Sequence, residues 1–434
     1  MKIEKNKEHK SKKINNLKAK GFNLYEIIGI IVITSIISIA TSGIIINNNY
    51  RTSSGLSYSE LLKDDKVKEF LNVYSKVVAG YYESVDKDGA IDSAINGMVK
   101  FIGDEYTTYM DNEDASVLVN SLSGKYEGIG ISISTQDTGL IVKVHDNSPA
   151  SASGLQANDR IIKVNDTKIT KDNAGDISKL IKESTDKKVK LTVNRDNQEL
   201  EFNLELKEIN TPAVSDDIIE SNGHKIGYMK ISTFSKTLTE QVSSSLTKME
   251  SQNIDSLIID LRDNGGGYLN VATDVASLFL EKGKVIYSLE SKNGTSTKKD
   301  ETDEKRTYPI MVLINGATAS AAEILTSALV DSYGAETLGT TSYGKGKVQQ
   351  AMNLKDGSLV KYTTYKWLRP NGECIDEAGI DPKYGVELEI IKDEEGKIKE
   401  VHDTQYTKAI EIMSNKDINW CSFLHQLPVQ PNFT

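Results

Sequence analysis

The sequence is poor in the residues on which several classes of site depend. Its 434 residues include two cysteines, Cys374 and Cys421, and seven prolines. Two cysteines allow at most one disulfide and exclude a zinc ribbon built on cysteine ligands. The low proline content and a hydrophobic fraction of 38% exclude a low-complexity or wholly disordered chain. The length is sufficient for two or three domains with packed cores.

An excess of positive charge is also missing from most of the chain, whose formal net charge is −10. Residues 1–26 contain eight Lys and three Glu, a net charge of +5, so residues 27–434 carry −15. Because nucleic-acid phosphates require a basic face, this acidic bulk argues against a nucleic-acid partner.

One long apolar segment stands at the point where the charge changes sign. Ile27 to Ile46 contains no charged residue, and its twenty residues are about the length that crosses a bilayer core. We predict a single transmembrane anchor at 27–46, with residues 1–26 as a cytoplasmic basic tail. The positive-inside rule then places the remainder of the chain outside the cytoplasm, at the cell membrane.

A cleaved signal peptide is the alternative interpretation of this segment. Small residues at Ala40 and Ser42 are compatible with cleavage. The apolar run is, however, longer than the usual hydrophobic region of a signal peptide, which favours an uncleaved anchor.

The sequence pattern divides the rest of the chain into a tether, an N-terminal helical region, a β-rich domain, an α/β core and a tail. Residues 47–57 are polar and predict a tether, and residues 58–120 show a helical pattern. The apolar positions of two helices recur there every three or four residues, namely Phe70, Val73, Val77 and Tyr81, then Ile91, Ile95, Met98 and Phe101. Residues 124–207 consist of short β-branched runs and predict a compact β-rich domain. We assign no role to the tail at 401–434.

The region 208–400 is predicted to be an α/β core, because strand and helix patterns alternate along it. The predicted strands lie at 226–234, 256–261, 309–314 and 358–367, and the predicted helices at 238–249, 269–280 and 320–332. Residues 290–307 contain no apolar side chain and predict an exposed hairpin or loop.

A serine lies at the end of one of the most apolar strands. In PIMVLINGATASAA, residues 309–322, the strand ends in Asn-Gly and small residues, and a helical pattern begins near Ser320. A hydroxyl at a helix N-terminus lies beside unpaired N–H groups that favour a developing oxyanion. Serine is also the commonest kind of N-cap, and on this feature alone the N-cap is the simpler interpretation.

A histidine base for this serine is hard to find, because only His224 falls within the core, where it opens a strand. A lysine held neutral by burial can also take a proton from a hydroxyl. Lys345 is the candidate, since its neighbours Gly344 and Gly346 allow a sharp turn and close approach to another segment. The alternative is an ordinary exposed loop lysine.

The same stretch raises the possibility of a nucleotide hydrolase. Gly339 to Lys345 matches seven of the eight positions of a phosphate-binding loop. Gly346 stands where Ser or Thr should hold magnesium, and residues 348–354 lack a convincing helix start, so this interpretation is disfavoured.

A glycine cluster supplies candidate oxyanion donors. In IIDLRDNGGGYL, residues 258–269, a buried strand breaks into three glycines before a helix. Consecutive glycines expose N–H groups that can point at an anion. A tight turn alone explains the cluster equally well.

Seven segments taken together resemble the C-terminal processing peptidases, also called tail-specific proteases, over roughly residues 60–390. They are DEYTTYMD at 104–111, EGIGISI at 127–133, SPASASGLQANDRIIKVND at 148–166, DLRDNGGG at 260–267, NGATASAAEILTSALVD at 315–331, LGTTSYGKGKVQQ at 338–350 and GIDPKYGVE at 379–387. The resemblance implies a protease core of crotonase-like or Clp-protease-like βα units with an inserted PDZ domain. It also implies a serine and lysine dyad, no cofactor, no metal, and a homodimer built through the N-terminal helices.

Carried over by position, the resemblance makes Ser320 the nucleophile, Lys345 the general base and Gln349 the side chain that holds the lysine. The implied oxyanion donors are the N–H groups of Gly266, with Gly265, and of Ala321. Thr318 and Ala322 stand where the family often has serine, but neither is the nucleophile. The tail is too short for the complete peptidoglycan-binding domain that some relatives carry, so no cell-wall anchoring is expected.

The glycine loop Gly128-Ile129-Gly130 is predicted to bind substrate. Its N–H groups can receive a carboxylate while the adjoining strand edge pairs with an extended peptide. We therefore expect a membrane-anchored serine endopeptidase that cleaves extracytoplasmic proteins with free C-termini near those termini. A catalytically inactive PDZ-containing adaptor is the alternative.

Overall fold

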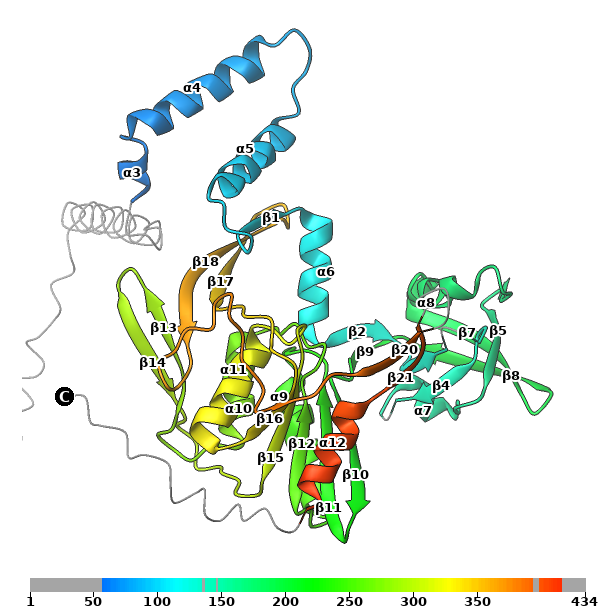
Figure 1. Cartoon of the computed structure of the whole chain (residues 1–434). Coiled ribbons are helices and arrows are strands. Elements are labelled where there is room, and N and C mark those ends of the chain that lie inside the picture. The colour runs from blue at the N-terminus through cyan, green and yellow to red at the C-terminus, as the bar shows by residue number, and fades with distance from the viewer. Residues whose placement is uncertain (1–56, 135–136, 146, 393–397, 416–434) are drawn as a thin grey trace, which may run out of the picture. The chain divides into compact units, whose positions relative to one another are not determined.

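The computed structural model describes residues 57–415 except 135–136, 146 and 393–397 (Figure 1). The predicted anchor at 27–46 and the basic tail before it lie outside the described residues. Among the residues described, none of the helices combines the length and the apolar character needed to cross a membrane. The described residues divide into two compact units, and the boundary falls between Ala94 and Ile95.

The first unit contains the predicted N-terminal helices. α3 spans Tyr58–Leu61 and α4 spans Asp65–Gly80, where the Asp64 side chain caps the first turn by accepting from two N–H groups. α5, Lys87–Phe101, begins in this unit. α4 buries none of its residues, so its apolar stripe is exposed.

The α/β core of the second unit is built on a six-stranded sheet in the order β10-β11-β12-β15-β16-β19. Its strands are Val214–Ser221, His224–Ile231, Ser256–Asp260, Ile310–Ile314, Glu336–Gly339 and Tyr384–Gly385 in that order. The pair β10–β11 is antiparallel and the other pairs are parallel. This sheet confirms the predicted α/β core.

Helices cover both faces of the sheet, as the apolar runs of its parallel strands require. Leu257 and Ile259 of β12 pack with α9 (Leu238–Glu250), α10 (Leu269–Ser277) and α11 (Ala321–Ala328), which continues as a π-helical turn at Leu329–Tyr333. Ile258 points to the other face and packs with Ala409 and Met413 of α12, Thr404–Met413. The core therefore extends beyond residue 400, and α12 belongs to it rather than to a separate tail (Figure 1).

A second sheet has the order β1-β18-β13-β14, and β17 pairs with β18. Its strands are β1 Thr108–Met110, β13 Val285–Ser291, β14 Gly294–Lys299, β17 Lys347–Asn353 and β18 Leu359–Leu368. The hairpin β13–β14 confirms the prediction for residues 290–307.

The β-rich domain has its own hydrophobic core. It follows α6, Asn112–Ser123, and contains strands β2 Lys125–Gly128, β3 Ile131–Ile133, β4 Ile141–Val144, β5 Arg160–Val164, β6 Thr167–Lys168, β7 Lys188–Arg195, β8 Gln198–Glu205 and β9 Lys207–Asn210. Its helices are α7 Pro149–Ser153 and α8 Ile177–Lys182.

A further hairpin lies outside this domain, near the end of the described chain. It consists of β20, Glu389–Lys392, and β21, Ile398–His402, and precedes α12.

Candidate active site

Ser320 lies in the turn between β15 and α11, immediately before the first residue of the helix. Its backbone has φ 57° and ψ −117°, a conformation that residues other than glycine seldom adopt. Its N–H donates to Glu323 Oε2 at 2.8 Å, which holds the strained residue at the start of α11. Residues kept in such conformations cluster at functional sites, because the surrounding structure must hold them there.

One of the predicted oxyanion glycines, Gly266, lies against this turn. A Cβ on Gly266, whose φ is 96°, would lie 2.8 Å from the Ala319 carbonyl oxygen and 2.9 Å from the Ala321 nitrogen. Only glycine therefore allows the two segments to approach so closely. The Gly266 N–H already donates to Asn264 Oδ1 at 2.9 Å. The N–H groups of Gly265 and Ala321 have no acceptor within the part of the chain that the structure describes.

Lys345 lies half-buried in the loop between β16 and β17. Burial, and secondarily the charge of Lys361, lower the pKa of its amine, as a lysine base requires. Its Nζ is 4.7 Å from the centroid of the Tyr106 ring. Within the described residues no hydrogen bond joins Nζ to the hydroxyl of Ser320.

Glu323 joins the two segments, and the sequence reasoning did not single it out. Its fully buried carboxylate accepts the N–H of Ser320 and, at 3.0 Å, the N–H of Lys345 on Oε2. Oε1 accepts the Ser342 hydroxyl at 2.6 Å and the Gly344 N–H at 2.7 Å. Burial raises the pKa of this carboxyl, while the four donors act in the opposite direction. The available signal was a glutamate three residues after a serine N-cap, the spacing of a capping box.

Within the described residues the Gln349 side chain donates its hydrogen bond to Thr363 rather than to Lys345. Its Nε2 donates to Thr363 Oγ1 at 3.2 Å, and the Thr363 hydroxyl donates to Asp104 Oδ2 at 2.6 Å. The glutamine is thereby connected to the loop that precedes β1, which also carries Tyr106. The motif at 104–111 thus contributes directly to the surroundings of the lysine.

The predicted substrate loop Gly128-Ile129-Gly130 leads from β2 into β3. Ile129 is buried. Gly130 has φ 82°, and a Cβ at this position would lie only 2.2 Å from Ser148 Cβ, which is a collision. β3 pairs with β4 along one edge, and no strand of the described chain pairs with its other edge. A free strand edge beside a glycine loop is the arrangement that β-augmentation by a peptide uses.

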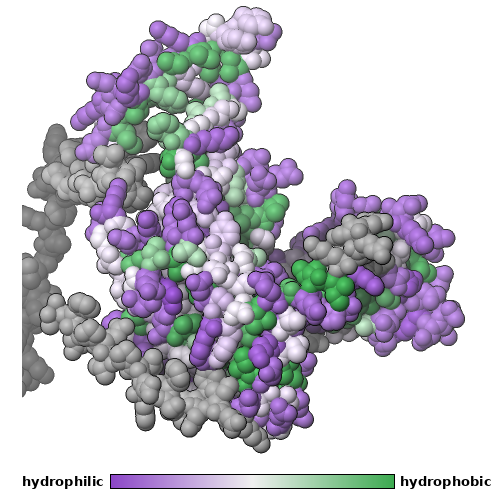
Figure 2. All heavy atoms as spheres, viewed as in Figure 1, coloured by the Kyte–Doolittle hydropathy of each residue, from purple (hydrophilic) through white to green (hydrophobic). Residues whose placement is uncertain are grey.

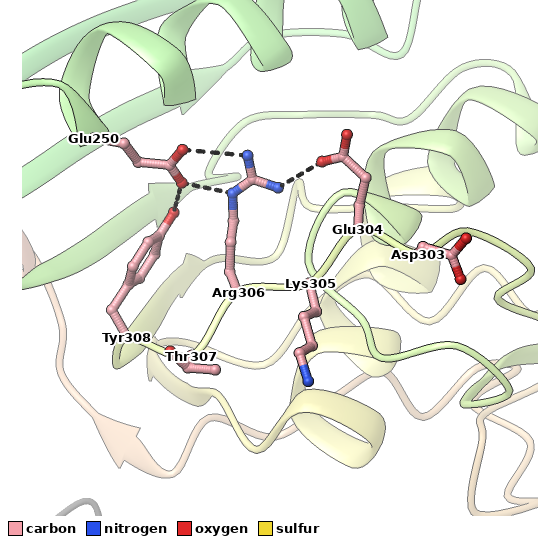
Figure 3. A pocket seen from close by; sticks show the side chains of 7 residues that line it. All are labelled: Glu250, Asp303, Glu304, Lys305, Arg306, Thr307 and Tyr308. Carbon is pink, nitrogen blue, oxygen red and sulfur yellow. Dashed lines mark hydrogen bonds and ion pairs between the residues drawn. The ribbon is translucent and has the colours of Figure 1, made fainter.

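A separate polar pocket lies on the core and has a structural explanation (Figure 3). It is lined by Glu250 and residues 303–308, and none of the predicted site residues lines it. Arg306 Nε donates to Glu250 Oε1 at 2.6 Å, and the Tyr308 hydroxyl donates to the same oxygen at 2.9 Å. These contacts fasten the loop before β15 to the end of α9.

The phosphate-binding interpretation is not supported by the fold. The segment after Gly346 forms β17 rather than a helix, so no helix N-terminus faces a phosphate there.

Comparison with known proteins identifies the family of this chain. Residues 225–386 match the model of peptidase family S41, residues 128–206 match the PDZ domain, and residues 39–114 match the N-terminal domain of the activating protease CtpB. The carboxy-terminal processing protease CtpA of Bacillus subtilis (strain 168) is 36% identical over 363 residues, which are 83% of this chain and 76% of the relative. CtpB of the same organism is 33% identical over 328 residues, 75% of this chain and 68% of the relative.

Among solved structures, a photosystem II D1 C-terminal processing protease superposes with a TM-score of 0.45 and 22% identity. The superposition covers 78% of this chain and 91% of that structure. The sequence identities to the Bacillus proteins and the matched domains confirm the resemblance seen in the motifs. The chain belongs to peptidase family S41 and is a carboxy-terminal processing serine protease with a PDZ domain.

Proposed function

We propose that this protease uses a Ser320–Lys345 dyad and acts, while anchored in the cell membrane, on extracytoplasmic proteins with free C-termini. The observation that carries the dyad is the buried Glu323 carboxylate, which binds the peptide N–H groups of both residues. A single side chain therefore fixes the position of the serine relative to the lysine. The lowered pKa of Lys345 supports its role as base.

In the proposed reaction, the neutral Lys345 amine takes the proton of the Ser320 hydroxyl as the oxygen attacks the scissile carbonyl carbon. The developing oxyanion accepts hydrogen bonds from the free N–H groups of Ala321 and Gly265, beside the positive end of α11. The lysine ammonium then gives its proton to the leaving amine. A water molecule, deprotonated by the same lysine, then attacks the acyl carbon. As the ester bond breaks, the lysine ammonium returns a proton to the Ser320 oxygen, which restores the hydroxyl and the neutral amine.

The test of the dyad is the Lys345→Arg variant, which keeps the positive charge. We expect cleavage of an unfolded protein substrate to fall to background, because a guanidinium is not deprotonated at working pH. Ser320→Ala should be equally inactive. In the wild type, kcat should rise as pH increases through the lowered pKa of Lys345, because only the neutral amine is a base. Retained cleavage by either variant would refute the dyad.

The membrane anchor is proposed from the sequence of residues 27–46 and from the lysines that precede it. Protease added to intact spheroplasts should degrade the catalytic domain and leave the basic tail with its anchor. A full-length protected chain would contradict this orientation, and a mature N-terminus near residue 43 would indicate a cleaved signal peptide and a secreted enzyme.

The PDZ domain is proposed to recognise the substrate C-terminus or to gate its access to Ser320. The free edge of β3 supports this role, because an extended peptide can pair with it while its carboxylate meets the Gly128–Gly130 loop.

A homodimer through the N-terminal helices is the remaining part of the proposal. Phe70, Val73 and Val77 of α4 are 48%, 55% and 50% exposed, and hydrophobic atoms line this helix in Figure 2. Exposed apolar stripes mark interaction surfaces, and a second copy presents the same stripe.

A further inference from the structure

The loop that carries Lys345 has no regular secondary structure, so other segments must hold its backbone in place. The side chain of Trp367, on β18, makes one of these contacts. Its indole Nε1 donates to the Lys345 carbonyl oxygen at 2.8 Å, and its backbone N–H donates to the Gly346 carbonyl oxygen at 2.9 Å. Trp367 thus donates hydrogen bonds to the carbonyl groups of two successive residues, the predicted base Lys345 and its neighbour Gly346.

Trp367 is itself firmly held. It is 1% exposed, belongs to the main hydrophobic core, and lies opposite Leu289 where β18 pairs with β13. A buried indole N–H usually has a partner, and the partner here is the carbonyl group of the lysine. Without the indole that carbonyl oxygen would lose this donor in a half-buried site.

Both polar groups of the Lys345 backbone are therefore bound by buried side chains from different elements. Its N–H donates to Glu323 of α11, and its carbonyl accepts from Trp367 of β18. Glu323 also binds the N–H of Ser320. The chain of contacts runs from the serine through Glu323 and the lysine backbone to the second sheet.

We propose that Trp367 is a positioning residue for the catalytic lysine, acting through the hydrogen bond from its indole N–H to the Lys345 carbonyl. The inference rests on the proposed function of Lys345 as base. Its physical reason is that a displacement of about 1 Å in a catalytic group can lower a rate by about a hundredfold. The lysine also depends on its place in the fold to be neutral, because burial is the main cause of its lowered pKa.

The titratable groups around the lysine amine come from several elements, and Trp367 is not one of them. They are Glu323 of α11, Asp104, Glu105 and Tyr106 of the loop before β1, Lys347 of β17 and Lys361 of β18. A residue at 367 that does not titrate therefore alters the pH profile only by moving the lysine among them, and the profile of a histidine variant is compared above about pH 8, where the imidazole is neutral.

The experiment compares Trp367→Phe with Trp367→His in the full chain. Phenylalanine keeps an aromatic ring but removes the donor. Histidine loses more apolar volume, yet its Nε2 is separated from Cγ by the same two bonds as the indole Nε1 and can carry a hydrogen. Tyr333→Phe is the matched control. It also removes one aromatic donor to a backbone carbonyl, because the Tyr333 hydroxyl donates to the Tyr308 carbonyl oxygen over 2.6 Å, and neither residue belongs to the predicted site.

We expect Trp367→Phe to lower kcat near neutral pH by about threefold to tenfold, the loss typical of one hydrogen bond, with little change in KM. Its pH–rate profile should move to higher pH, since a loosened amine meets more water and its pKa returns towards the ordinary value. Trp367→His should keep the wild-type profile and the larger kcat of the two. Tyr333→Phe should lower the melting temperature without moving the profile.

Three results would overturn the proposal. The first is a Trp367→Phe enzyme that matches Tyr333→Phe in kcat and pH profile. The second is a higher kcat for phenylalanine than for histidine, which would mean that packing alone matters. The third, decisive if the phenylalanine variant does not fold, is a shifted profile for Trp367→His. Failure of the dyad itself is recognised separately, because Lys345→Arg would then remain active.

Discussion

Helices α11 and α4 differ sharply in how far their side chains are buried. All eight residues of α11 are buried, whereas none of the sixteen residues of α4 is. Both sequences carry apolar residues at helical spacing, so the pattern alone does not distinguish them. The difference is that the core surrounds α11 on every side, while the apolar stripe of α4 and the free edge of β3 are left open to other molecules.

The closed region should be the more sensitive to a small change, and Glu323→Gln is the sharpest test. An amide replaces one carboxylate oxygen with a donor. That donor then faces either the Gly344 N–H and the Ser342 hydroxyl, which already accepts from the Ile380 N–H, or the N–H groups of Ser320 and Lys345. Each unpaired buried donor costs about 1–3 kcal/mol, so we expect kcat to fall about a hundredfold or more.

The control for this variant is Glu250→Gln, which removes a carboxylate from the Arg306 cluster in Figure 3. It should reduce the melting temperature while kcat stays within about twofold of the wild type. If Glu323→Gln kept full activity, the carboxylate would not be what joins the nucleophile to the base.

The open face of α4 predicts an effect on assembly. We expect Val73→Lys to shift the detergent-solubilised chain from dimer to monomer, as measured by light scattering. The reason is the high free-energy cost of burying an unpaired charge between two apolar stripes. Lysine is a good helix former, so α4 itself should persist. Ser75→Lys adds the same charge on another side of the helix and should leave the mass unchanged. A dimer that survives in the Val73 variant would place the interface elsewhere.

The smallest effect is expected at the free edge of β3. Amidation of a substrate's C-terminus removes the charge that the Gly128–Gly130 loop is proposed to bind, and should lower kcat/KM by about threefold to tenfold. The change is made in the substrate because a side chain at Gly130 would collide with Ser148 and disturb the loop itself. Equal rates for amidated and free substrates would show that the carboxylate is not recognised.

Sequence patterns predicted the alternation of strands and helices in the core because its parallel strands are uniformly apolar. They also singled out Ser320 and Lys345 as candidates, since both follow strand ends and stand beside small residues. The role of Glu323 depends on a loop some twenty residues away, so its capping-box spacing suggested only local structure. The contribution of α12 was missed because a short amphipathic helix does not reveal which surface will cover it.

The position of Gln349 could not be predicted from spacing either. In β17 its side chain meets Thr363 across the register with β18, and that pairing is set by the whole sheet. The resemblance placed the glutamine near the lysine in sequence but carried no information on which rotamer the side chain adopts. Its role therefore remains a prediction.

The strand β1 has a consequence for how small a working protease can be made from this chain. Thr108 to Met110 pair with residues 359–361 of β18, and the loop just before them supplies the ring beneath the Lys345 amine. At the opposite end, α12 closes one face of the main sheet. A fragment cut to the peptidase segment 225–386 would lack both pieces. We therefore expect an active fragment to begin before Asp104 and to end after Met413.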